Sequence, residues 1–206
     1  MMRKGEMTRR RIVERSAAVF NTKGYFGSSM NDLVRETGFE KGGIYNHFAG
    51  KEELALEAFD YAAAVMGERF RSALEGREGA IERLLAVVDV LGGLAEDPPV
   101  AGGCPVLNTA VESDDAHPAL KARAAQAATD WLRLIGSIVK EGVGSGDLGP
   151  GTDPRATASV VVATLEGALM LSKLHDDPAH MHRAVDHLKE HLGSLATGRR
   201  AVGRGA

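Results

Sequence analysis

The 206-residue sequence contains one cysteine and one tryptophan, and aromatic residues make up only 5% of it. A single cysteine excludes an intrachain disulfide framework and suits a reducing compartment, so we expect a cytoplasmic protein. The sequence also lacks an apolar run of 18 residues, which argues against a membrane span or a membrane partner. Because no segment alternates convincingly between apolar and polar residues, the sequence predicts no β-sheet.

Helical periodicity, in contrast, extends through most of the chain. Hydrophobic residues make up 44% of the sequence and charged residues 26%, which is enough for a sizeable core. Apolar residues recur every three or four positions between stretches rich in Gly and Pro, so we predict an all-α protein. Nine helices are expected, at about residues 8–23, 30–37, 41–48, 51–74, 80–94, onward from 105, 118–143, 154–175 and 178–196.

Charge is distributed unevenly along the chain. The formal net charge is −3, yet the first 51 residues contain ten Lys or Arg and only five Asp or Glu. Basic residues, Arg10 among them, cluster before and within the first predicted helix. A local basic patch on an acidic protein is typical of a surface that binds the phosphates of nucleic acid, although a solvated basic arm has the same composition.

Residues 28–54 have the pattern of a helix-turn-helix followed by a third helix. Ser29 is a suitable N-cap, and Asp32 stands three residues later, which is the spacing of a capping box. Gly38 can end this helix in the left-handed conformation, and a second short helix follows from Lys41. Two short helices joined by a tight turn place side chains in the DNA major groove. We therefore expect the protein to bind double-stranded DNA.

The segment from about Thr8 to Leu54 resembles the DNA-binding domain of the TetR family of bacterial transcriptional regulators. The matching residues occur in the family's order and spacing. They are Ile12, Phe20, Gly24, Tyr25, Ser28 to Met30, Lys41, Gly42, Ile44, Tyr45, His47, Phe48, Lys51 and Glu52. Two positions depart from the family: Gly43 stands where a small polar or methyl-bearing residue is common, and Phe39 replaces a small aliphatic residue.

The chemistry of the side chains predicts which of them contact DNA. Asn46 can pair with adenine, and Lys41 with guanine or phosphate. Tyr45 and His47 are expected to hold phosphate, although Tyr45 can instead be a packing residue. Ser28 and Ser29 can bind a phosphate at the N-terminus of the helix that follows them, or Ser29 can serve only as the N-cap of that helix. The full predicted set is Arg10, Ser28, Ser29, Lys41, Gly42, Gly43, Tyr45, Asn46, His47 and Lys51.

The resemblance implies a three-helix DNA-binding domain at residues 1–50 and a six-helix ligand-binding and dimerisation domain at residues 51–197. Residues 198–206 are predicted to be a disordered tail. The last two helices would form a four-helix bundle with a second copy, and a homodimer suits a palindromic operator. Small residues on one predicted helix (Ala156, Ser159, Ala163, Gly167 and Ala168) and an apolar stripe from Met181 to Leu195 on the next support this, although both can pack within one subunit.

By resemblance, the C-terminal helices enclose a small-molecule pocket between the fourth and eighth helices. The candidate lining residues, each of which can equally be plain core, are Met66, Phe70, Cys104, Leu107, Asn108, Val111, Trp131 and Met170. We expect a repressor that leaves a palindromic operator when a small apolar effector binds. Cys104, at the predicted N-terminus of a helix, offers an alternative, which is a thiol sensor of electrophiles or oxidants.

Other functional classes find little support in the sequence. His187 and His191 are four residues apart with His180 on the same flank, but no cysteine or carboxylate cluster completes a metal site. The sequence contains no nucleophile elbow, phosphate loop or metalloprotease motif, so we expect neither an enzyme nor a cofactor. An architectural DNA-binding protein without an effector remains an alternative, against which the large C-terminal part argues.

Overall fold

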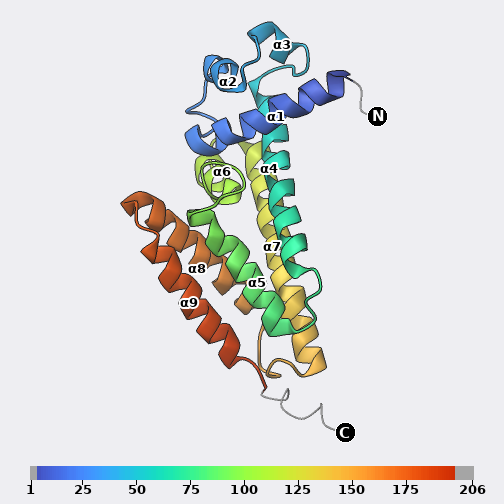
Figure 1. Cartoon of the computed structure of the whole chain (residues 1–206), viewed down its shortest axis with the longest axis vertical. Coiled ribbons are helices and arrows are strands. Elements are labelled where there is room, and N and C mark those ends of the chain that lie inside the picture. The colour runs from blue at the N-terminus through green and yellow to red at the C-terminus, as the bar shows by residue number, and fades with distance from the viewer. Residues whose placement is uncertain (1–3, 198–206) are drawn as a thin grey trace. The chain divides into compact units, whose positions relative to one another are not determined.

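A computed structural model of the chain describes residues 4–197 (Figure 1). Within this range the protein consists of nine α-helices and one short 3-10 helix, and no β-strand is present apart from an isolated bridge between Leu148 and Ala196. The prediction of an all-α fold is confirmed. The elements are α1 (Lys4–Lys23), α2 (Met30–Thr37), α3 (Lys41–Tyr45), α4 (Lys51–Leu74), α5 (Ala80–Gly92), η1 (Gly93–Ala95), α6 (Pro105–Ser113), α7 (Pro118–Ser145), α8 (Pro154–His175) and α9 (Ala179–Ser194). The predicted tail at 198–206 lies outside the described residues.

Several helix boundaries differ from the sequence prediction: α1 begins at Lys4 rather than near residue 8, and α3 and the fifth helix end earlier than expected. Helix α3 ends at Tyr45 rather than near Phe48, and the chain continues as a turn in which Phe48 still donates its backbone N–H to the Ile44 carbonyl. Two glycines within five residues weaken such a helix, because glycine loses the most backbone freedom on folding. The fifth predicted helix tightens at Gly93 into a 3-10 turn for the same reason.

The described helices form two compact units. The first contains residues up to 67 together with 98–127, which comprise α1, α2, α3, most of α4, α6 and the start of α7. The second contains residues 68–97 together with those from 128 onward, which comprise the end of α4, α5, η1, most of α7, α8 and α9.

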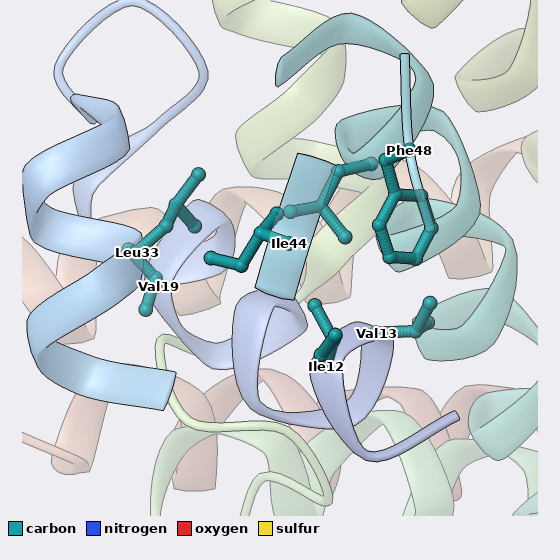
Figure 2. Close-up of a cluster of buried hydrophobic side chains, with 7 residues drawn as sticks. Ile12, Val13, Val19, Leu33, Ile44 and Phe48 are labelled. Atoms are coloured by element: carbon teal, nitrogen blue, oxygen red, sulfur yellow. The ribbon is translucent and has the colours of Figure 1, made fainter. Parts of the chain in front are cut away.

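The first unit has a hydrophobic core built by the three N-terminal helices and the start of α4 (Figure 2). Figure 2 shows side chains of α1 pointing toward the single buried residue of α3 and toward Phe48. Each of these side chains is almost completely withdrawn from solvent, so the positions of α2 and α3 are set by packing on α1 and α4. The cluster consists of Ile12, Val13, Val19, Leu33, Ile44, Phe48 and Leu54.

In the second unit, α5, α8 and α9 pack against one another (Figure 1). Helix α5 is buried on several sides, and Val87 and Val88 are both withdrawn from solvent. Gly92 lets α9 approach closely, because a Cβ at this position would lie 2.6 Å from Cγ2 of Val185. Asp153, which stands just before Pro154, caps α8 by accepting the backbone N–H groups of Arg155 and Ala156.

Helix α8 is apolar on two opposite faces. One face is buried in the unit and consists of Ala158, Val161, Leu165, Ala168 and Leu169. The other carries exposed apolar side chains, among them Val160, Met170 and Leu174. The helix is consequently long and apolar enough to cross a membrane by length and composition, although no run of 18 apolar residues exists, and 33% of its most apolar stretch is buried. Its packing against α5 and α9 is that of a core helix.

Candidate nucleic-acid interface

Helix α2 begins with the predicted capping box. The Ser29 side chain accepts the backbone N–H of Asp32, and the Asp32 carboxylate accepts the backbone N–H of Ser29 at 2.9 Å. The helix ends at Gly38, whose φ of 69° lies in the left-handed region, and the backbone N–H of Gly38 reaches the Val34 carbonyl. Arg15 of α1 donates to the Thr37 carbonyl at 2.6 Å, so this carbonyl at the end of α2 has a hydrogen-bond partner. These contacts fix the turn that orients α3.

Asp32 carries most of the polar contacts at this capping box. The hydrogen bond from the Ser29 hydroxyl, followed by those from Lys23, the Ser29 backbone and Arg35, holds the pKa of Asp32 well below its usual range. A depressed pKa means that the folded state binds fewer protons than the unfolded state in acid, so stability rises with pH through this window.

We expect the stability advantage of the wild type over Asp32→Asn to be full above about pH 4, near the ordinary Asp pKa, and to be lost as the pH falls further. Chemical denaturation at a series of pH values measures this difference. Asp186→Asn, an exposed change on α9, is the control. An advantage that stayed constant down to pH 2 would show that the carboxylate does not act through its charge.

Helix α3 presents most of its residues to solvent. Ile44 is its one buried residue, whereas Lys41, Gly42, Tyr45 and the following Asn46 are exposed. Gly43 and His47 are half-buried. A Cβ at Gly42 or Gly43 would meet no atom within 4 Å, so the protein's own fold does not require glycine at either position.

Lys51 and Ser28 have partners within the protein. The Lys51 ammonium donates to the Ser28 carbonyl at 2.7 Å and lies 4.2 Å from the ring centroid of Tyr25. Ser28 is buried and its hydroxyl donates to the Gly24 carbonyl. These two residues, predicted to bind phosphate, therefore also hold the loop before α2 against the start of α4, which the sequence did not indicate.

The basic residues of α1 divide into two kinds. Arg10 is exposed and lies 3.9 Å from the Glu14 carboxylate. Arg9, which the sequence grouped with it, instead forms ion pairs with Glu53 and Glu57 of α4 and covers the Phe48 ring. The hydrogen bond with Glu57 is the largest cause of the raised pKa of Arg9. Glu53 and Glu57 are four residues apart and share one face of α4, but nothing near Arg9 in the sequence indicates that it pairs with them.

The predicted effector residues belong to both units. Met66 and Cys104 are fully buried, and Leu107 and Asn108 half-buried, in the first unit. In the second unit Phe70 and Trp131 are buried and meet edge to face, with ring centroids 5.7 Å apart. Val111 and Met170 are exposed.

The first unit also contains a cavity of about 20 Å³, lined by residues of α1, α4 and α6 that include Phe20, Asn21 and Glu112. This volume holds about one water molecule and is too small for an effector of the usual size.

Cys104 is the N-cap of α6, and its sulfur accepts the backbone N–H of Leu107 at 3.4 Å. Reactive cysteines are generally partly exposed, so complete burial does not favour the thiol-sensor alternative. The histidine rings of His187 and His191 stack in parallel on α9. No group of three or more potential metal ligands occurs among residues 4–197.

Comparison with known proteins identifies the class of protein that this interface defines. Residues 12–58 match the family described as bacterial regulatory proteins, tetR family, and residues 80–188 match the tetracyclin repressor-like C-terminal domain. A TetR transcriptional regulator from Chloroflexus aurantiacus is 42% identical, with a TM-score of 0.91, over 95% of this chain and 98% of its own. A TetR-family regulator from Cytophaga hutchinsonii is 31% identical, with a TM-score of 0.86, over 96% of this chain and 98% of its own.

A curated relative, the HTH-type transcriptional repressor DhaR from a Mycobacterium species, is 24% identical, and the match covers 81% of this chain and 82% of the relative. The protein is thus a helix-turn-helix transcriptional regulator. It belongs to the TetR family, which consists of DNA-binding regulators rather than enzymes. The family implies binding to operator DNA and to an effector, and α8 is a core helix of a soluble regulator rather than a membrane span.

Proposed function

We propose that the protein is a cytoplasmic repressor that reads its operator with α3 and leaves it when a small apolar effector binds. The observation that carries this proposal is the α3 segment, which exposes polar side chains on a rigidly packed turn. Gly42 and Gly43, which the fold does not require, leave space for the sugar-phosphate backbone. The relative DhaR, which is described as a repressor, supports repression over activation.

Base recognition is assigned to Asn46 and Lys41, which are exposed on this segment. Tyr45, whose side chain is 45% exposed, and His47 are assigned to phosphate. Arg10, Ser28, Ser29, Gly42, Gly43 and Lys51 complete the proposed interface. Lys51 donates a hydrogen bond to the Ser28 carbonyl. The two residues therefore act on DNA by fixing the loop before α2 as well as by direct contact.

Asn46→Ala should relax base preference at one position of each half-site and lower the affinity for the preferred duplex about tenfold, since a bidentate amide–adenine pair discriminates by about 1–3 kcal/mol. Selection from a random duplex library, followed by titration of the selected operator, measures both effects. Asn31→Ala, an exposed change on α2, is the control. Unchanged base preference in Asn46→Ala would remove this residue from the interface.

Dimerisation is assigned to the outer face of α8. Its residues Val160, Ala163, Gly167, Met170 and Leu174 are spaced by three and four positions and are exposed or half-buried. A Cβ at Gly167 would meet no atom within 4 Å, so a second copy can approach closely there. This spacing is typical of a helix that packs against another helix along its length.

The predicted seam on α9 packs inside the subunit instead. Met181, Leu188 and Leu192 are buried in the second unit, and Val185 lies against Gly92 of α5. Ala168 of α8 is likewise buried within the subunit. The sequence pattern identified the apolar faces of the two helices but could not say which face a second subunit would cover.

The effector is assigned to the C-terminal part of the chain, with Met66, Phe70, Cys104, Leu107, Asn108, Val111, Trp131 and Met170 as proposed contacts. The Phe70–Trp131 pair offers an apolar surface suited to a flat or aliphatic molecule. Helix α4 begins next to the helix-turn-helix and contributes Met66 and Phe70 to this set, so a ligand on its later turns can bias its position. The functional division at residue 50 differs from the compact units, because α4 and α6 pack with the DNA-binding helices.

Trp131 is the chain's one tryptophan and therefore reports directly on the proposed site. A panel of small apolar compounds should contain members that change its fluorescence and lower operator affinity at the same concentrations. If compounds changed the Trp131 fluorescence without altering operator affinity, binding at this site would not regulate DNA binding.

A further inference from the structure

We infer that Glu112 of α6 positions the helix-turn-helix for operator binding by clamping the loop between α1 and α2. The inference deepens the proposed function and rests on it, because it names the contact through which a movement of α6 would reach the DNA-binding helices. Glu112 is a positioning residue in this scheme, and it touches no DNA.

The clamp is a pair of hydrogen bonds to consecutive backbone amides. Oε2 of Glu112 accepts the N–H of Tyr25 at 2.7 Å, and Oε1 accepts the N–H of Phe26 at 2.7 Å. Bonds to an ionised carboxylate are about twice as strong as neutral ones, and two adjacent bonds also fix direction. The loop is shaped to receive the carboxylate, since Gly24 has a φ of 75° and a Cβ there would lie 2.5 Å from Oε1.

A second contact holds α6 one helical turn earlier. Asn108 donates from its side-chain nitrogen to the side-chain and backbone oxygens of Asn21, at 2.9 Å each. Asn21, near the end of α1, donates in turn to the carbonyls of Ala101 and Gly103, which lead into α6. Because Asn108 and Glu112 are four residues apart, one face of α6 carries both contacts.

The clamped loop leads directly into α2. Three residues separate Phe26 from Met30, the first residue of α2, and Ser29 among them is its N-cap. Lys51 of α4 also holds the Ser28 carbonyl and lies over the Tyr25 ring. The ring of His117, just before α7, meets the Tyr25 ring edge to face with centroids 4.6 Å apart. A displacement of α6 is therefore transmitted to the start of α2 through the two hydrogen bonds of Glu112 and the short backbone segment that follows Phe26.

This arrangement gives α6 control over operator affinity. A dimer binds well only when both copies of α3 match successive major grooves, so a small shift at each clamp weakens the specific complex more than non-specific binding to phosphate. An effector or any event that moves the segment from Cys104 to Asn108 would act through Asn21 and Glu112.

The test compares full-length Glu112→Ala and Glu112→Gln with Glu78→Ala, an exposed change between α4 and α5. Titrations use the duplex selected from a random library and a scrambled duplex. We expect Glu112→Ala to lose about tenfold in operator affinity, within the usual range of coupling between sites. Binding to the scrambled duplex and the affinity of Glu78→Ala should stay unchanged. Glu112→Gln, which keeps one acceptor oxygen, should fall between Glu112→Ala and the wild type.

Amide NMR supplies a readout that does not depend on DNA. The Tyr25 and Phe26 N–H resonances should shift upfield in Glu112→Ala as they lose a carboxylate acceptor, and by less in Glu112→Gln. If both resonances move while operator affinity stays at the wild-type value, the hydrogen bonds exist but do not position the helix-turn-helix on DNA, and the inference is overturned. If the wild type prefers no duplex at all, the proposed function fails and the inference fails with it. Should Glu112→Ala not fold, Glu112→Gln decides between these outcomes.

Discussion

Leu174→Asp should convert the protein from a dimer to a monomer. Leu174 is 71% exposed on the outer face of α8, so the change costs the isolated subunit little. In a twofold interface the same substitution occurs twice, and two carboxylates would lose water at an apolar seam. We expect dimerisation to weaken about 1000-fold, on the basis of about 2 kcal/mol for each copy. Analytical ultracentrifugation over a range of concentrations measures this change.

Operator binding should fall with the dimer, because the second half-site contact is then no longer intramolecular, and the loss is about 100-fold or more. Ala122→Asp, which adds the same charge at an exposed position of α7, should leave the mass and the affinity unchanged. A Leu174→Asp protein that sedimented as a dimer would exclude the α8 face from the interface.

Ile44→Ala should disable DNA reading while leaving the second unit folded. Helix α3 has five residues, two of them glycine, and therefore no stability of its own. Ile44 is its one buried side chain and, together with Phe48, holds it on α1 (Figure 2). Removing a buried isoleucine down to Cβ costs about 3 kcal/mol, most of which should appear as local loss of α3.

Operator affinity should therefore fall about 100-fold, since the fraction of competent α3 limits binding. Ile138→Ala is the matched control, because Ile138 is equally buried but lies on α7 in the second unit. It should lower the melting temperature without reducing the affinity of the folded protein. Operator titration at a temperature well below both transitions separates the two effects. Equal affinity for the two variants would contradict the role of Ile44.

The parts of the fold set by short-range chemistry could be predicted from the sequence. The capping box of Ser29 and Asp32, the left-handed Gly38 and the Asp153 cap each involve residues within a few positions of one another. Such motifs can be recognised because one turn of backbone brings their partners together. The resemblance to the TetR family rests on the same local pattern, and the family matches confirm it.

Long-range pairings could not be predicted in this way. The carboxylate of Glu112 meets amides 86 and 87 positions away along the chain, and nothing near Tyr25 or Phe26 indicates it. Arg9 belongs to a basic cluster in the sequence, yet it pairs with α4 in the structure. Composition reports the charge of a segment, whereas the partner of each charge depends on packing between distant helices.

The open space around Gly42 and Gly43 bears on how a protein of this kind can change its target. A Cβ added at either position would meet no protein atom within 4 Å, and alanine there would strengthen a short helix by up to about 1 kcal/mol. In the proposed complex, however, a side chain at either position enters the space assigned to the sugar-phosphate backbone, so a single substitution there can change operator binding without disturbing the fold.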